Sequence, residues 1–120
     1  MKKIIAAILL ITIMAVPAFA KFSSKGAIPG GEPVEYRGLV IRDTGASIVL
    51  INRSETQRVT FSGAVSFLVA RKEVADFFIE KVTLEPLEQL PLEKLYVKGD
   101  AKAAKKAEQL RWTIYTLEKK

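Results

Sequence analysis

The chain contains no cysteine and no histidine, and these two absences exclude much of protein chemistry. Without cysteine there is no disulfide and no thiol nucleophile. Without histidine there is no imidazole base, so hydrolases that pair a serine with a histidine are excluded. Cysteine and histidine also supply most ligands for zinc and other soft metals. The sequence therefore predicts a protein that is not an enzyme and that has no metal site and no cofactor.

Carboxylates are the remaining candidates for catalysis. Glu85, Glu88 and Glu93 cluster around Pro86 and Pro91, and such residues serve as acid and base only if they converge in a cleft. Acidic residues are seldom buried, so we interpret these three as solvated loop charges. A calcium ion is not predicted, because the spacing of a calcium-binding loop is absent.

Methionine is also scarce, and both of the 2 methionines lie in the first 20 residues. A lysine pair there precedes an apolar run over Ile4–Val16, and small residues follow at Ala18 and Ala20. This is the pattern of a signal peptide over residues 1–20, with cleavage between Ala20 and Lys21. As a helix the run rises about 20 Å, which is shorter than the roughly 30 Å core of a bilayer. We therefore expect export to the periplasm, with secretion into the medium as the alternative.

The rest of the chain has room for one domain. Residues 21–34 are rich in glycine, proline and serine, which predicts a flexible N-terminal segment before a domain over residues 35–120. We expect strands near residues 35–42, 46–52, 57–71, 75–84, 92–98 and 110–117. Residues 57–71 alternate most clearly, with larger apolar residues on one face. Ser62 and Ser66 fall on the other face, which we expect to be solvated or lightly covered. Gly63 predicts a bulge that would let this strand serve both sheets.

Three further segments complete the expected fold. Pro86 and Pro91 indicate a surface connection over residues 85–90, and the Asn52-Arg53-Ser54 sequence indicates a turn. Residues 100–109 are rich in alanine and lysine, which favours a short helix with Asp100 as its N-cap. The whole pattern predicts an all-β protein: an antiparallel, immunoglobulin-like two-sheet sandwich of six to seven strands, with one short helix before the last strand. A small β-barrel is the alternative.

The order of these expected strands resembles that of small secreted immunoglobulin-like modules of bacteria, among them the FxLYD type. The resemblance rests on the Val49-Leu50-Ile51-Asn52-Arg53-Ser54 segment, on Phe61-x-Gly63-x-Val65-x-Phe67, and on a proline-marked loop before a closing strand with Trp112. It spans about residues 35–118. The resemblance implies a binding or structural piece of the cell envelope without catalytic activity.

Positive charge is concentrated at the end of the chain. Acidic and basic residues balance over residues 21–97, so the positive excess of the expected exported chain lies in residues 98–120. In a helix Lys102, Lys105 and Lys106 would share one face and form an anion-binding patch. We prefer the simpler interpretation that these lysines are solvated and keep a short helix soluble. Nucleic acid is not expected as a partner, because the chain is expected to be exported and no aromatic residues interleave with these three lysines to stack bases.

Aromatic residues suggest a second surface. Phe77 and Phe78 are adjacent in an expected strand and must point to opposite faces, as must Trp112 and Tyr115. Phe78 and Tyr115 are the candidates for exposed partner contacts. We therefore expect an exported, non-catalytic module that acts through protein contacts in the envelope, with an exposed edge strand as one means of pairing with a partner. The alternative is a binder of anionic surfaces, with weak contact to acidic lipid headgroups or acidic polymer.

Overall fold

The computed structural model describes residues 21–120 of the chain; the predicted signal peptide, residues 1–20, lies outside the described residues. The described strands are β1 (Gly26–Ala27), β2 (Val34–Arg42), β3 (Gly45–Asn52), β4 (Val59–Val69), β5 (Lys72–Leu84), β6 (Gln89–Leu95), β7 (Val97–Gly99) and β8 (Gln109–Lys119). One helix, α2 (Ala101–Ala104), lies between β7 and β8. Two short strands, β1 and β7, bring the count above the six or seven expected.

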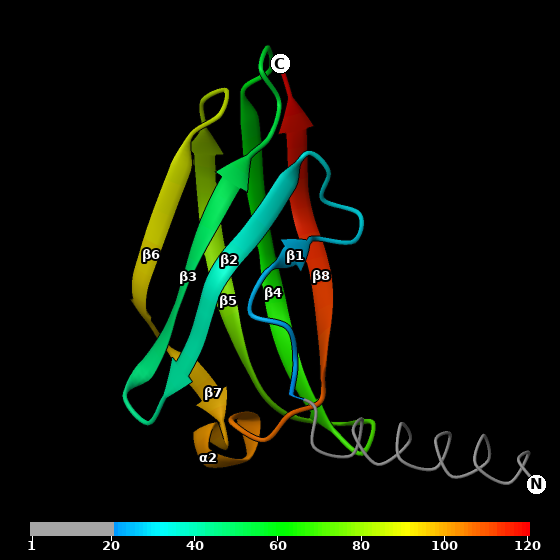
Figure 1. The fold of residues 1–120 in the computed structure, drawn as a ribbon, viewed down its shortest axis with the longest axis vertical. Coiled ribbons are helices and arrows are strands. Elements are labelled where there is room, and N and C mark those ends of the chain that lie inside the picture. Colours follow the sequence, from blue (N-terminus) through cyan, green and yellow to red (C-terminus); the bar gives the residue numbers. More distant parts are fainter. Residues whose placement is uncertain (1–20) are drawn as a thin grey trace, which may run out of the picture.

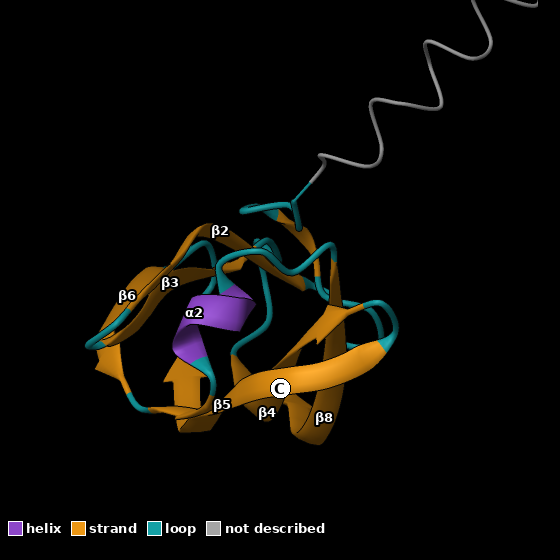
Figure 2. Ribbon diagram, turned by 90° about the horizontal axis from the view of Figure 1, so that it is seen from below, coloured by secondary structure: helices purple, strands orange, loops and turns teal. Residues whose placement is uncertain are grey.

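The strands form two antiparallel sheets that pack face to face (Figure 1). One sheet has the order β1-β2-β3-β6 and the other has the order β7-β5-β4-β8. Viewed end on, the two layers remain separate sheets (Figure 2). The predicted two-sheet sandwich is therefore confirmed, and the alternative of a closed barrel is not found in the part of the chain that the structure describes.

The core lies between the two sheets and is built from the alternating residues of the central strands. Phe61, Phe67 and Phe77 are fully buried from one sheet, and Ile48 and Leu50 are fully buried from the other. Successive side chains of a strand point to opposite faces, so one apolar set per strand reaches the core. Each fully buried side chain of this size contributes about 1.5–3 kcal/mol. The apolar sequence of β3 follows from its place between β2 and β6.

Strand β4 departs from the expectation in two respects. The predicted bulge is present, because the register with both neighbouring strands shifts next to Gly63. However, β4 stays in one sheet, so the expectation that it serves both sheets is wrong. Ser62 and Ser66 are also buried, although a solvated or lightly covered face was expected; β4 is a central strand, flanked by β5 and β8.

The strand expected over residues 92–98 is divided between the two sheets. Residues 92–98 do not form one strand: β6 pairs with β3 in one sheet, β7 pairs with β5 in the other, and Tyr96 lies between them. Strand β6 also begins at Gln89 and includes Pro91, so residues 85–90 are not wholly a connection. The proline is tolerated because β6 is an edge strand.

The predicted helix is shorter than expected, with four residues rather than about ten. Asp100 is its N-cap as predicted, and the carboxylate accepts a hydrogen bond of 3.0 Å from the Ala103 amide. Ala104 and Ala107 are fully buried, and the helix covers one end of the sandwich (Figure 2). The chain has to cross that end and enter β8 at Gln109, which leaves no length for further helical turns.

Part of the segment expected to be flexible packs against the domain. Phe22 lies edge-on to Phe67 with ring centroids 5.2 Å apart, and Ile28 is fully buried. The Tyr36 hydroxyl donates a hydrogen bond of 2.8 Å to the Ser23 carbonyl. Among residues 21–120, no helix has the length and apolar character needed to cross a bilayer.

Asn52 fastens the other end of the sandwich. Its buried side-chain amide donates to the carbonyls of Gln57, Leu84 and Glu85 at 2.8, 3.2 and 3.1 Å. Its side-chain oxygen accepts a hydrogen bond from the Ser54 amide at 3.0 Å, as expected for a turn. The two connections that pass between the sheets at this end, β3–β4 and β5–β6, are therefore held by a single side chain.

Candidate functional site

The structure brings the two predicted contact aromatics together on the outer face of one sheet. The rings of Phe78, in β5, and Tyr115, in β8, lie 5.8 Å apart between centroids. Ala64 of the central strand β4 is opposite Phe78 on one side and opposite Thr113 on the other. Because alanine is small, the two rings can approach each other over it. They form an exposed aromatic pair in place of two separate side chains.

Strand β8 places the Tyr115 ring in this position through a local irregularity. Ser62 is opposite Thr116, and the next residue, Gly63, is opposite Ile114, which leaves Tyr115 as an extra residue in β8. A bulge of this kind commonly re-aims a side chain. The same Gly63 that predicted a bulge thus helps to direct Tyr115 toward Phe78. A Cβ atom at Gly63 would lie 2.7 Å from the Thr113 carbonyl oxygen.

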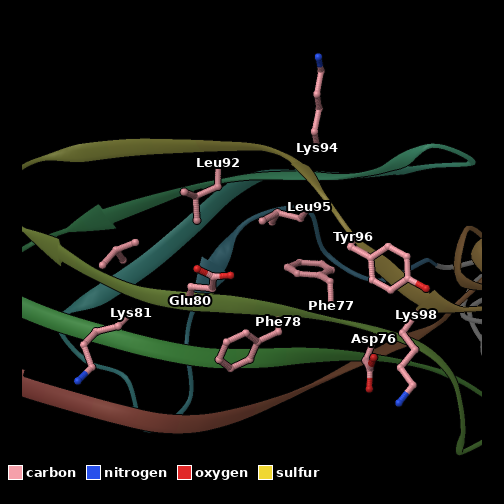
Figure 3. A pocket seen from close by; sticks show the side chains of 11 residues that line it. Asp76, Phe77, Phe78, Glu80, Lys81, Leu92, Lys94, Leu95, Tyr96 and Lys98 are labelled. Carbon is pink, nitrogen blue, oxygen red and sulfur yellow. The ribbon is translucent and has the colours of Figure 1, made fainter.

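A groove opens along one long side of the sandwich, between β5 and β6. Its volume is about 580 Å³. Its apolar lining comes from Phe77, Val82, Leu92 and Leu95, which belong to both sheets. Phe78 lines the groove (Figure 3) and its ring also lies against that of Tyr115, so the aromatic pair adjoins the groove.

Tyr96 is a third exposed aromatic residue at this surface, and the sequence analysis did not select it. It lines the same groove and is 80% exposed, against 51% for Phe78 and 63% for Tyr115. It lies where the chain changes sheets, and Figure 3 shows its ring beside the groove. The available signal was its spacing from Lys94 and Lys98, because residues two apart in a strand share a face and a face that carries two lysines is directed toward solvent.

Charged residues surround the apolar lining of the groove. Lys81, Lys94, Lys98, Asp76 and Glu80 contribute to its walls. Figure 3 shows Glu80 on the same side of β5 as Leu92, and it shows Lys94 directed away from the groove. The ion pairs of residues 21–120 are Glu35–Arg53, Glu85–Arg58, Asp43–Lys105 and Glu73–Arg111, so none of the five groove charges is neutralised within the described chain.

The structure does not assemble the predicted anion-binding patch as one helical face. Of the three lysines, only Lys102 lies in α2; Lys105 is the C-cap residue and Lys106 follows it. The Lys105 ammonium lies 2.7 Å from the Asp43 carboxylate in the β2–β3 turn. This hydrogen bond and the Lys105 charge lower the pKa of Asp43 below its ordinary value. Lys102 and Lys106 border a shallow depression that also includes Asp100.

The acidic residues considered for catalysis have other contacts. The Glu88 carboxylate accepts a hydrogen bond of 2.8 Å from the Glu85 amide, and Glu85 forms an ion pair with Arg58 at 3.0 Å. Glu93 is exposed on β6. Within residues 21–120, no three acidic side chains lie close enough together to hold a metal ion.

Comparison with protein-family models, with curated proteins and with solved structures finds no match to this chain. The resemblance to FxLYD-type modules therefore stays a prediction. The described geometry is the basis for a functional proposal.

Proposed function

We propose that this protein is an exported, non-catalytic β-sandwich that binds another protein of the cell envelope. The binding surface consists of the groove between β5 and β6 together with the rings of Phe78, Tyr96 and Tyr115, and we call it the groove surface. Its role is accessory or structural, in the periplasm or in the medium.

The clustering of exposed aromatic rings is the observation that carries this proposal. Five large hydrophobic side chains are exposed in the described chain; of the three aromatic ones, Phe78 and Tyr96 line the groove and Tyr115 lies against Phe78. Aromatic side chains supply much of the binding energy in protein interfaces, where they fill pockets and exclude water. An apolar groove bordered by exposed rings and unneutralised charges combines these features.

Partner capture with matched variants tests the proposal. The double variant Phe78→Ser/Tyr115→Ser removes both rings from the outer face of the sheet. Leu87→Ser is the control, because Leu87 is 57% exposed and is not among the groove residues. An envelope protein that is retained by the wild type and by Leu87→Ser, but lost with the double variant, supports the proposal. Equal retention by all three proteins contradicts it.

The alternative function, binding of anionic surfaces, is less well supported by the geometry. Asp43 neutralises Lys105, and Asp100 lies in the depression beside Lys102 and Lys106. Sedimentation with vesicles of anionic lipid tests it. If the alternative is right, binding fades as salt rises and is lost when the three lysines are replaced by glutamine.

A further inference from the structure

The outward side chains of the sheet β7-β5-β4-β8 form a face with a flat centre. Phe61, Val65 and Phe67 of the central strand β4 are fully buried in the core, so the residues that alternate with them point outward. These outward residues are small: Ser62, Ala64 and Ser66. The rings of Phe78 and Tyr115, which we call the ring pair, meet over this stripe. The stripe allows another flat surface to approach the ring pair closely.

Four charged side chains lie around the ring pair, and their signs alternate. Toward α2, Ser66 lies between Asp76 of β5 and Arg111 of β8. Toward the other end of the sheet, β5 carries Lys81 and β8 carries Glu118. Figure 3 shows Asp76 and Lys81 on the same side of β5 as the exposed ring of that strand. Each of the two strands therefore has an acidic side chain on one side of its ring and a basic side chain on the other.

Two further charges on this face balance each other. Lys98 of β7 is opposite Asp76, and Glu73 of β5 forms an ion pair with Arg111. The strand residues of this face therefore include three acidic and three basic side chains. The expected exported chain, in contrast, has a net positive charge. Two copies repel each other through that net charge, and this balanced face adds no repulsion of its own.

The pattern of charges is complementary to itself. When a second copy is turned over about an axis that crosses β5 at Phe78, its β5 runs antiparallel to that of the first copy. Asp76 of each copy then faces Lys81 of the other, and the two ring pairs meet at the centre. An axis along β4 would instead set Asp76 against Arg111, which Glu73 already neutralises. Asp76 and Lys81 take part in no ion pair among residues 21–120, so they favour the first arrangement.

We infer that this face binds a second copy of the chain in a two-fold symmetric dimer, with the ring pairs at its centre and two Asp76–Lys81 contacts beside them. Three strands about 4.8 Å apart and about nine residues long present roughly 450 Å² on each copy. This area is small for a permanent interface, so we expect a weak dimer with a Kd on the order of ten to a hundred micromolar. The inference goes beyond the proposed function, because a second copy covers the rings until another envelope protein binds.

Sedimentation equilibrium of the exported protein, from low micromolar to near-millimolar concentration, tests this inference. We expect monomer and dimer without larger species, because a two-fold contact closes on itself. Phe78→Ser/Tyr115→Ser should stay monomeric, whereas Leu87→Ser should dimerise like the wild type. Both rings are more than half exposed, so the double variant should remain folded, and thermal unfolding checks this.

Exchanging the two free charges tests the arrangement of the copies. Asp76→Lys and Lys81→Asp should each weaken the dimer on the order of tenfold, because like charges then face each other twice. The combined variant Asp76→Lys/Lys81→Asp should restore dimerisation, since opposite charges face each other again. Glu93→Lys is the matched control: it makes the same change of charge at an exposed residue of β6, in the other sheet, and should have little effect.

Three results would overturn the inference: a monomer at every concentration, a dimer that survives Phe78→Ser/Tyr115→Ser, or a combined charge exchange that dimerises no better than the single variants. None of them touches the proposed function, which stands if capture of another envelope protein depends on the rings. Conversely, a dimer with the expected charge dependence and no captured protein would leave this inference intact and contradict the proposed function.

Discussion

At the scale of single residues, the side chain of Asn52 makes more hydrogen bonds than any other in the described chain. Its amide serves three carbonyls from two connections, and its side chain is fully buried. Replacement by alanine removes the hydrogen-bond donor of these three carbonyls at a buried position. We expect Asn52→Ala to lower the free energy of unfolding by about 2–4 kcal/mol in urea denaturation.

Two further variants separate this effect from a general sensitivity of the region. Asn52→Asp keeps the oxygen that accepts from Ser54 but puts a carboxylate against three carbonyls, so it should cost more than alanine. Glu55→Ala, an exposed change in the same connection, should stay within about 0.5 kcal/mol of the wild type. If Asn52→Ala matched Glu55→Ala, the fastening role of this amide would be wrong.

The Asp43–Lys105 pair predicts a small dependence of stability on pH. The folded-state pKa of Asp43 lies below its ordinary value of 3.8 because of Lys105. Folding therefore favours the charged carboxylate. The contribution is fully present above pH 3.8 and is lost as the pH falls through the folded-state pKa.

Thermal unfolding of Asp43→Asn and the wild type measures this contribution. The wild type should melt slightly higher near neutral pH, and the difference should decrease below pH 3.8 and disappear once the pH is below the folded-state pKa. The pair is on the surface, so the difference should be small and should shrink in high salt. A difference that grew as the pH fell would have the wrong sign for this pair.

Single residues also show where sequence reasoning was sufficient. Phe78 and Tyr115 were selected because adjacent residues of a strand must face opposite ways, and that rule is local. Their contact with each other was not predictable, because it depends on β4 lying between β5 and β8 and on the register at Gly63. Tyr96 was missed because its exposure depends on the change of sheets between β6 and β7, and its position near Lys94 and Lys98 was the only local signal.

At the scale of elements, the turn from β7 into α2 requires glycine. Gly99 has φ of +103°, and a Cβ atom there would lie 2.6 Å from the Val74 carbonyl oxygen. Backbone conformations of this kind cost other residues about 1–3 kcal/mol, and the close approach adds to that cost. We expect Gly99→Ala to destabilise the protein by more than the backbone cost alone.

Gly38→Ala is the matched control for that variant. Gly38 also has a positive φ, +63°, but the nearest atom to an added Cβ is a Val49 methyl at 3.9 Å. It therefore carries the backbone cost without the collision. Urea denaturation should rank Gly99→Ala as clearly the less stable protein, and the reverse order would show that the contact with Val74 is easily relieved.

Element boundaries were predictable where periodicity was strong. Strands β2, β3, β4, β5 and β8 lie within a few residues of their expected ranges, because alternation and turn residues act locally. The helix was overestimated, since propensity favours it over residues 100–109 while the need to reach β8 ends it after Ala104. The groove between β5 and β6 has no signature in its own residues, because it results from where β6 and β7 pair.

At the scale of the whole molecule, three of the six strand pairs join strands that are not consecutive in the chain, and such pairs slow folding. Strand β3 pairs with β6, and β4 pairs with β8. Sandwiches dominated by such pairings fold on the order of milliseconds to seconds. The lone tryptophan, Trp112, reports on this step because its ring lies 5.3 Å from that of Tyr36 in the opposite sheet.

Stopped-flow refolding monitored by tryptophan fluorescence checks the prediction. We expect a single phase in that time range, coincident with the gain of far-ultraviolet circular dichroism. Refolding in microseconds, or a fluorescence change that clearly follows the circular dichroism, would show that the two sheets do not close in one cooperative step.

The sandwich is fastened at its two ends, by the Asn52 amide and by the buried alanines around α2, while the groove lies along a side that neither fastening needs. The rim side chains Phe78, Lys81 and Tyr96 can therefore be exchanged with little effect on stability. Such a division makes the molecule a natural scaffold for engineering, in which a library of rim sequences could be selected for new targets without redesigning the framework.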